Sequence, residues 1–162
     1  MSIRIITTGG TFDKLYFDAL SEFKIGDPMA IPLLDEANVS FDYEVQSLLR
    51  KDSLEITDED REAIRQAVAD APETRILVTH GTDTLVDSAR ALQGIDSKTI
   101  VFFGAMQPAR MRHSDANFNL GVACCAVQLL PPGIYIAMNG RIFDPFEVSK
   151  NRARGRFEPI QP

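Results

Sequence analysis

The chain has 162 residues, of which 44% are hydrophobic and 25% are charged, and its formal net charge is −6 at pH 7. This balance is typical of one soluble globular domain and excludes global disorder or a coiled coil. The negative net charge disfavours nucleic acid and anionic membranes, so we expect neither as a partner. The two cysteines, Cys124 and Cys125, are adjacent, which excludes a disulfide framework and predicts a cytoplasmic protein.

Short runs rich in β-branched and aromatic residues predict the strands of one sheet. Four of them are continuous apolar runs and a fifth is weaker; in chain order they are residues 3–8, 41–49 (the weaker one), 75–80, 99–103 and 133–138. Continuous rather than alternating apolar strands are typical of a sheet that is covered on both faces.

Helical patterns lie between these strands. Thr57 is a candidate N-cap with three acidic residues after it, and the apolar residues that follow have helical spacing. Residues 83–93 and 114–130 show two more helical patterns. Strands that alternate with helices predict an α/β fold: a doubly wound, mostly parallel (flavodoxin-like) sheet with helices on both faces, in a single domain over residues 1–162.

Two segments lack a regular pattern. Residues 13–28 are interpreted as a mobile loop over the carboxyl edge of the sheet, and residues 150–162 as a basic tail. Before that tail, Asn139 and Gly140 form a strong hairpin-turn signal.

The strand ends carry the residues with chemical potential. Residues 7–11, 80–84 and 104–106 are rich in hydroxyl groups or glycine, and ligands of open α/β sheets bind at the carboxyl ends of the strands. Glycine lets the backbone approach a ligand, a hydroxyl can act as a nucleophile, and backbone N–H groups can stabilise an oxyanion. The sequence therefore predicts a site at this edge.

One strand end leaves two interpretations open. Thr82 and Asp83 are neighbours there, and Lys150 could reach the same edge and act as a base in its neutral form. Alternatively, Thr82 and Thr84 cap a helix, and Asp83 favours its first turn.

At these positions the sequence resembles the bacterial-type L-asparaginases. Thr-Gly-Gly-Thr at residues 8–11 and His-Gly-Thr-Asp-Thr at residues 80–84 resemble two of their motifs. Further matches follow the family's order, at residues 52–57, 104–108, 118–120 and 147–151. The resemblance runs from Ile3 to about Asn151, and it is to the short, single-domain members of the family.

The resemblance implies an amidohydrolase that converts L-asparagine to L-aspartate and ammonia through a threonine acyl-enzyme, with no cofactor and no metal. Thr11 matches the nucleophile, and the supporting triad is matched by Thr82, Asp83 and Lys150. The positions implied for substrate binding are Ser53 for the α-carboxylate, Asp83 for the α-amino group, Ala105 for the leaving amide, and the glycines Gly10 and Gly81. The implied partner is a small amino-acid amide.

Three departures from the family pattern carry expectations of their own. The chain ends where a C-terminal domain would begin, so we expect no such domain and a homodimer or higher homo-oligomer. The family's loop tyrosine aligns with Phe23, and Tyr16 in the same loop is the candidate for the missing hydroxyl. Leu54 stands where the family has a polar residue, which predicts a high KM.

Two rival functions fit less of the chain. A flavodoxin-like phosphate cradle at residues 8–11 would make the protein an FMN-binding electron carrier, and a catalytically lapsed amino-acid-binding module would keep the fold alone. Among the remaining residues, His80 is expected to pack beneath its strand end, and Cys124 and Cys125 are expected to be inert core.

Overall fold

The computed structural model describes residues 1–161 and contains one six-stranded sheet. Its strand order is β4-β1-β5-β6-β7-β8, and only β8 runs antiparallel to its neighbour. The strands are β1 (Ser2–Gly9), β4 (Asp42–Lys51), β5 (Arg75–Thr79), β6 (Thr99–Phe103), β7 (Gly133–Met138) and β8 (Arg141–Phe143). The predicted doubly wound, mostly parallel α/β fold is thereby confirmed.

Helices cover both faces of this sheet. Helices α1 (Ala30–Glu36) and α4 (Ala116–Leu129) enclose one apolar core, and α2 (Asp58–Asp70) and α3 (Leu85–Arg90) enclose the other. Successive strand residues alternate between the cores: Val101 and Phe103 face α4, whereas Ile100 and Phe102 face α2 and α3. This two-sided burial explains why the central strands are continuous apolar runs.

Helix boundaries follow local hydrogen bonds. The Thr57 hydroxyl accepts from the Asp60 N–H, and the Asp60 carboxylate accepts from the Thr57 N–H, so the predicted N-cap of α2 is confirmed as a capping box. The helices predicted over residues 83–93 and 114–130 are shorter, because α3 begins only after Thr84 and α4 after Asp115.

Three hairpins complete the fold. Asn139 and Gly140 both have positive φ, 54° and 73°, and form the predicted turn between β7 and β8. The other two hairpins are β2 (Lys14–Phe17) with β3 (Glu22–Ile25), and β9 (Val148–Asn151) with β10 (Arg156–Pro159).

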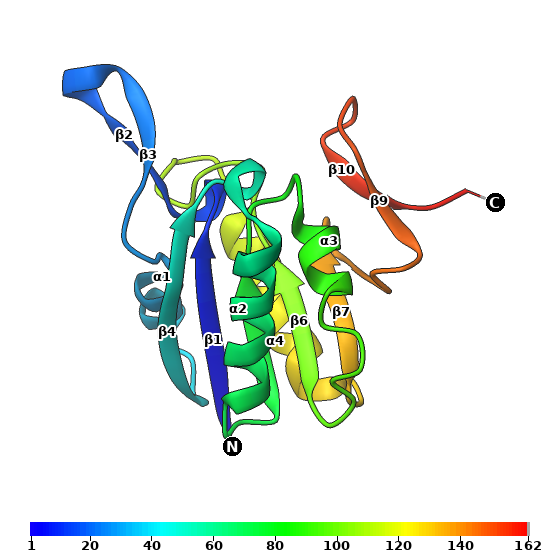
Figure 1. Ribbon diagram of the computed structural model, residues 1–162. Helices are drawn as coiled ribbons and strands as arrows, with labels where there is room; N and C mark the ends of the chain where they lie inside the picture. Colours follow the sequence, from blue (N-terminus) through cyan, green and yellow to red (C-terminus); the bar gives the residue numbers. More distant parts are fainter. Residues whose placement is uncertain (162) are drawn as a thin grey trace.

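These last two hairpins correct the interpretation of residues 13–28 as a loop and of residues 150–162 as a tail. The two strands of each hairpin are joined by their own backbone hydrogen bonds, and a residue near each turn, Ser21 or Gly155, has a left-handed conformation. Backbone pairing of this kind forms strands even where the sequence shows no regular pattern of apolar residues. Both hairpins rise from the carboxyl edge of the main sheet (Figure 1). Pro162, the last residue of the predicted tail, lies outside the described residues.

Within residues 1–161, no helix has the length and apolar character needed to cross a bilayer. The same residues contain no group of His, Cys, Asp and Glu side chains that could hold a metal ion. Cys124 is buried, as expected, but Cys125 is exposed, because the two neighbours lie on different sides of α4. The expectation of an inert core pair is therefore wrong for Cys125.

Candidate active site

Backbone contact between two strand ends creates the site. Gly10, after β1, has φ +76°, and a Cβ on it would lie 2.5 Å from the N and Cα atoms of Gly81, after β5. A Cβ on Gly81 would in turn lie 2.5 Å from the Cβ of Ser53. Only glycine permits both approaches, so these two residues bring Thr11, Thr82 and Ser53 to one place.

Hydrogen bonds lock these ends together. The Thr8 hydroxyl donates to the Thr79 carbonyl oxygen at 2.7 Å, and the Gly10 N–H donates to the Lys51 carbonyl oxygen at 2.9 Å. The end of β1 is therefore tied to β5 on one side and to β4 on the other.

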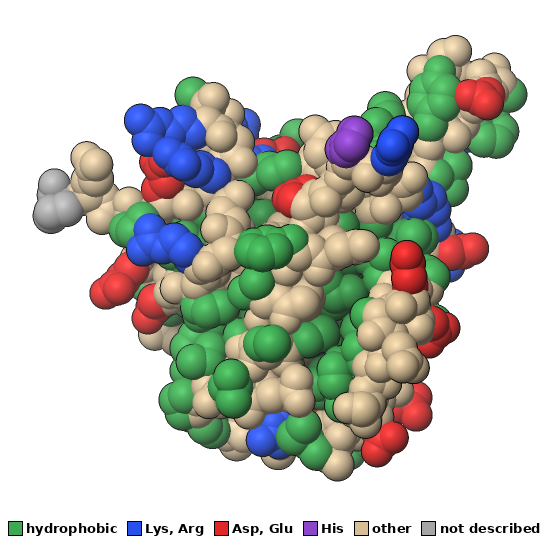
Figure 2. Space-filling view, turned by 180° about the vertical axis from the view of Figure 1, so that it is seen from behind, with side chains coloured by type: hydrophobic (Ala, Val, Ile, Leu, Met, Phe, Trp, Pro, Cys, Tyr) green, Lys and Arg blue, Asp and Glu red, His purple; other side chains and the backbone are tan. Residues whose placement is uncertain are grey.

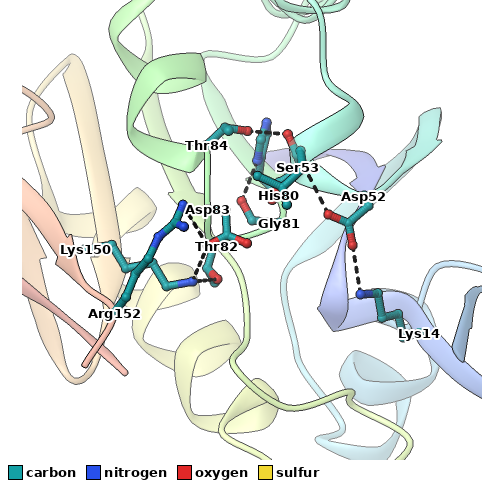
Figure 3. A network of polar contacts seen from close by, with 11 residues as sticks. Lys14, Asp52, Ser53, His80, Gly81, Thr82, Asp83, Thr84, Lys150 and Arg152 are labelled. Carbon is teal, nitrogen blue, oxygen red and sulfur yellow. Dashed lines mark hydrogen bonds and ion pairs between the residues drawn. The ribbon is translucent and has the colours of Figure 1, made fainter. Parts of the chain in front are cut away.

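A triad of side chains lies at the β5 end. The Lys150 side-chain nitrogen donates to the Thr82 hydroxyl and to Oδ1 of Asp83, at 2.8 Å in each case (Figure 3). Thr82 is buried, and Arg152 reaches the same Asp83 oxygen at 3.4 Å. The structure thus brings together three of the residues that the sequence singled out, across 68 residues of chain.

The position of Lys150 depends on the β9–β10 hairpin. Val148 and Phe157, one on each strand, are buried in the core on the α2 and α3 side. The Asn139 side-chain oxygen accepts from the Phe157 N–H at 2.8 Å, and Arg90 donates to the Pro145 carbonyl oxygen at 2.8 Å. The hairpin that carries Lys150 is therefore attached to the body of the fold.

The capping interpretation of this strand end holds for the position of Thr84, which is the N-cap residue of α3, but not for a side-chain cap. Thr84 precedes α3, but its hydroxyl makes no cap bond and instead donates to the Ser53 carbonyl oxygen at 2.7 Å. The Thr82 hydroxyl accepts from Lys150. Both hydroxyls are engaged across the site rather than at the helix end.

Ser53 is the first residue of a short 3₁₀ helix, η3 (Ser53–Glu55), and is buried. Asp52 caps η3 and accepts from the Lys14 ammonium at 2.8 Å (Figure 3). The Lys14 hydrogen bond, which is the main cause, keeps the pKa of Asp52 below its usual value. A charged pair therefore lies directly beside Ser53.

His80 packs beneath the β5 end, as expected. Its side chain is fully buried, and its Nδ1 lies 2.8 Å from the Gly81 carbonyl oxygen. Burial lowers the pKa of His80 to about 4, so the ring is neutral at pH 7. Its role here is to support the turn that carries Thr82.

The end of β6 is held by the start of α4. The Asn119 side-chain amide donates to the Gly104 carbonyl oxygen at 2.9 Å, and the Asp115 carboxylate accepts from the Met106 N–H at 2.9 Å. Ala105, between them, is buried, so its backbone has a fixed position at the edge of the site.

Thr11 and Tyr16 lie on the β1 side. Thr11 begins the 3₁₀ helix η1 (Thr11–Asp13) and is partly exposed, and none of the hydrogen bonds of the triad reaches it. Tyr16 is on β2, where the residue is 52% exposed and its ring packs edge-on against Phe23 at 5.5 Å between centroids. The structure does not bring Tyr16 into contact with the triad.

The foot of the β2–β3 hairpin contains residues that the sequence did not single out. The Asp13 carboxylate is buried and accepts from the Met29 N–H at 2.8 Å. Burial raises its pKa to about 6. The Asp13 backbone carbonyl oxygen accepts from Arg110, which also donates to the Asp27 carbonyl oxygen. Arg110 therefore holds both ends of the hairpin.

Of the residues missed from sequence, some had a usable signal. Asp52 and Glu55 have the spacing of a capping box, which would have placed a turn at Ser53. Asp13 and Arg110 had none, because their roles come from burial and from a contact 97 residues apart.

Comparison with known proteins is consistent with this geometry. Residues 2–158 match the family model described as "Asparaginase, N-terminal". An L-asparaginase from Thermococcus kodakarensis is 33% identical over 165 residues, which cover 96% of this chain and 49% of that protein.

Two solved structures share the fold. The thermostable L-asparaginase from Thermococcus kodakarensis superimposes with a TM-score of 0.86 at 30% identity, covering 99% of this chain and 51% of that one. L-asparaginase I from Vibrio cholerae O1 gives 0.84 at 22% identity, covering 98% and 51%. The chain thus spans about half the length of the relatives that it matches.

Proposed function

The chain belongs to the asparaginase family, and we propose that it is an amidohydrolase that converts L-asparagine to L-aspartate and ammonia. The observation that carries the proposal is the Thr82–Asp83–Lys150 network, with two bonds of 2.8 Å, beside the glycine-rich turn that presents Thr11. A buried hydroxyl held by a lysine is an arrangement that can move a proton at a reacting centre.

In the proposed reaction, the Thr11 oxygen attacks the side-chain amide carbon of the substrate. The C–N bond breaks, ammonia leaves with the proton released by the hydroxyl, and an ester joins Thr11 to the substrate acyl group. Water then attacks the ester, which restores the Thr11 hydroxyl and releases the carboxylic acid. Splitting amide hydrolysis into these two steps is the general advantage of a covalent intermediate.

The triad is proposed to move protons as the Thr11 oxygen, and then water, attacks the carbonyl carbon. Lys150 in its neutral form accepts a proton through Thr82, and Asp83 fixes the position of the lysine. Tyr16 is proposed to approach Thr11 when the β2–β3 hairpin closes over a bound amide.

The remaining residues are proposed to bind the substrate. Ser53 binds the α-carboxylate, Asp83 pairs with the α-amino group, and the Ala105 carbonyl oxygen accepts from the leaving amide. Gly10 and Gly81 keep the backbone close enough for these groups to act on one small molecule. No cofactor or metal takes part in the proposal, and the enzyme is proposed to be cytoplasmic with a high KM.

A homodimer or larger even-numbered oligomer is part of the proposal. The site lies at an open edge of the sheet between two hairpins, and a second copy would shield it from water (Figure 1). Sedimentation velocity on fully active protein tests this, and full activity in a strictly monomeric species would contradict it.

The experiment that tests the function is steady-state ammonia release by the purified chain with L-asparagine, D-asparagine and L-glutamine. Release that saturates with L-asparagine supports the proposal. Substrate binding without any ammonia would indicate a lapsed binding module instead. A yellow protein with flavin absorbance would indicate the FMN carrier, and either result would overturn the proposal.

A further inference from the structure

The outer face of α4 is exposed although this helix carries no charged residue. Residues 116–130 contain no Asp, Glu, Lys or Arg, in a chain in which 25% of the residues are charged. One side of the helix packs on the sheet, but on the other side Phe118 is 62% exposed and Leu129 is 82% exposed. A surface helix normally carries charged residues on its outer face, so this face is typical of one that another surface covers.

Two grooves with apolar linings run beside α4. One, of about 560 Å³, lies between α4 and Ile142 of the edge strand β8, and none of the described residues that line it is charged. The other, of about 230 Å³, lies between α4 and α1, and Glu36 is the one charged residue among the described residues of its lining. Figure 2 shows hydrophobic side chains over much of this surface, with the charged ones mainly at its rims. We call this surface, from α1 across α4 to β8, the α4 face.

Gly121, in the middle of α4, has no structural reason within the chain. It is exposed, and a Cβ at this position would meet no described atom within 4 Å beyond the backbone of its own helix. Glycine in the interior of a helix is less stable than alanine, so its presence here is a cost that the monomer does not offset. Both grooves reach Gly121, and the missing side chain leaves a hollow into which a side chain from outside can fit.

A second copy of the chain fits this face better than a charged partner or a lipid surface. In a two-fold contact the same surface meets itself, so one face must carry both projections and hollows. The α4 face carries both, with Phe118 and Leu129 as projections and the hollow at Gly121. A chain with a net charge of −6 repels its own copy least where the facing surfaces are uncharged. A helix that lies on lipid is usually rich in Lys and Arg, and α4 has neither.

The size of the face also suits a dimer. Helix α4 has 14 residues and is about 21 Å long, and the grooves beside it make the face roughly twice as wide as a helix, about 20–24 Å. The apolar part is therefore on the order of 500 Å² in plan, and exposed apolar patches of this size often mark interaction surfaces. A polar rim around it would complete the roughly 800 Å² per partner that a stable interface buries.

We propose that the α4 face is a two-fold interface between copies of this chain, in which α4 packs against α4 of the second copy near Gly121. The interface is separate from the open carboxyl edge that holds the site, because α4 covers one face of the sheet. It does not depend on the proposed function. The α4 face alone would build a dimer, and together with a second two-fold interface it would build a tetramer.

Sedimentation equilibrium on the full chain tests the inference. Leu129→Glu places a charge on the α4 face, and Gly121→Leu fills its hollow. The matched control is Ala69→Glu, which adds the same charge at an exposed position near the end of α2, on the other face of the sheet. Circular dichroism checks that each variant folds, which we expect because Leu129 is largely exposed and the space beside Gly121 is open.

We expect the wild type to sediment as a dimer or a tetramer. Leu129→Glu and Gly121→Leu should each halve the mass, with a dissociation constant about tenfold or more higher, and Ala69→Glu should leave the mass unchanged. Gly121→Ala should weaken association but raise the melting temperature of the dissociated monomer, because alanine favours the helix. A purely structural role of Gly121 would not give these opposite signs.

Two results would overturn the inference. One is a wild type that stays monomeric at every concentration, whether the α4 face then binds phosphatidylcholine vesicles or another protein. The other is an oligomer that keeps its mass in both Leu129→Glu and Gly121→Leu, which would place the interface elsewhere, such as at the carboxyl edge. Sedimentation does not depend on ammonia release, so an oligomer that dissociates as expected but releases no ammonia would overturn the proposed function alone.

Discussion

The ends of β1 and β5 lie side by side, and each leads through a glycine into a turn that carries a threonine, but their surroundings differ. Thr82 at the β5 end is buried and bonded to Lys150, whose hairpin is anchored by Val148 and Phe157. The β2–β3 hairpin that follows Thr11 has no buried residue in its strands and is held only at its foot. Buried anchors, rather than the motifs themselves, decide which half of the site is assembled before substrate arrives.

The largest effect should separate the two threonines. Thr11→Val removes the proposed nucleophile, so ammonia release should fall about 10⁴-fold or more and no covalent acyl-enzyme should form. Thr82→Val should also slow turnover, but it should leave an acyl-enzyme that mass spectrometry detects. Thr74→Val, an exposed threonine at the opposite edge of the sheet, is the matched control and should be neutral. An acyl-enzyme in Thr11→Val would assign the nucleophile elsewhere.

Replacing Lys150 tests the Thr82–Asp83–Lys150 network at the end of β5. Lys150→Met should reduce kcat about 10²-fold or more, because the Thr82 hydroxyl loses its only triad donor. Folding should be retained, since the hairpin keeps Val148 and Phe157 in the core. Arg156→Met, on the same hairpin but paired with Glu158, should stay close to wild type. Turnover near wild type in Lys150→Met would remove this lysine from the mechanism.

The pH dependence of stability distinguishes the two strand ends by sign. Asp13, on the β1 side, has a folded pKa of about 6 against 3.8, so the folded state holds its proton longer. Its contribution therefore lowers the free energy of unfolding as pH rises from about 4 to 6, by roughly 3 kcal/mol. His80, under the β5 end, has a folded pKa of about 4 against 6.5, so stability rises with pH in nearly the same window.

The two contributions oppose each other in the wild type. Asp13→Asn removes the first, keeps an acceptor for the Met29 N–H, and should raise stability at pH 7. Without the opposing contribution of Asp13, the contribution of His80 remains, so the free energy of unfolding of the variant should increase from pH 4 to 6.5. Urea unfolding across this range is the measurement, with the exposed Asp18→Asn as the control. A variant that is less stable at pH 7 would show that the charged carboxylate is favoured where it lies.

The smallest effect concerns the β2–β3 hairpin, on the Thr11 side of the site. Tyr16→Phe should reduce kcat about tenfold and leave the fold unchanged, because the hydroxyl acts only when the hairpin approaches Thr11. Phe23→Tyr, its edge-on neighbour, should have much less influence. Stopped-flow measurement of acylation compares them, and equal small effects would mean that the proton takes another route.

The sequence predicted the sheet well because its strands carry their own signal. Central strands such as β6 are apolar on both faces, with Ile100 in one core and Phe103 in the other. The strands β1, β5 and β6 each lead directly or within two residues to a glycine. The resemblance placed Thr82, Asp83 and Lys150 in a triad, and the structure brings these three into contact. Thr11, Tyr16, Ser53 and Ala105 keep their assigned roles as predictions.

The β2–β3 and β9–β10 hairpins, and the positions of Arg152 and Asp13, could not be predicted from apolar patterns. Tyr16 and Phe23 face solvent, so their strands show no apolar side from which to infer pairing. Arg152 was one basic residue among several in a predicted tail, whereas in the structure it lies in the turn between β9 and β10, 3.4 Å from Oδ1 of Asp83. The raised pKa of Asp13 results from its burial, which the neighbouring residues in the sequence do not indicate.

The way in which the β9–β10 hairpin is anchored also determines how the protein can lose activity without unfolding. A hairpin that depends on Val148 and Phe157 can detach as a unit at lower free energy than global unfolding. Such a detachment withdraws Lys150 while the six-stranded sheet keeps its circular-dichroism signal. Heat inactivation would then precede melting, and trypsin, which cleaves after arginine, would cut the hairpin tip at Arg152 and Arg154 in a molecule that is otherwise folded. Activity that depends on Lys150 would thus report the local order of this hairpin rather than the folding of the whole domain.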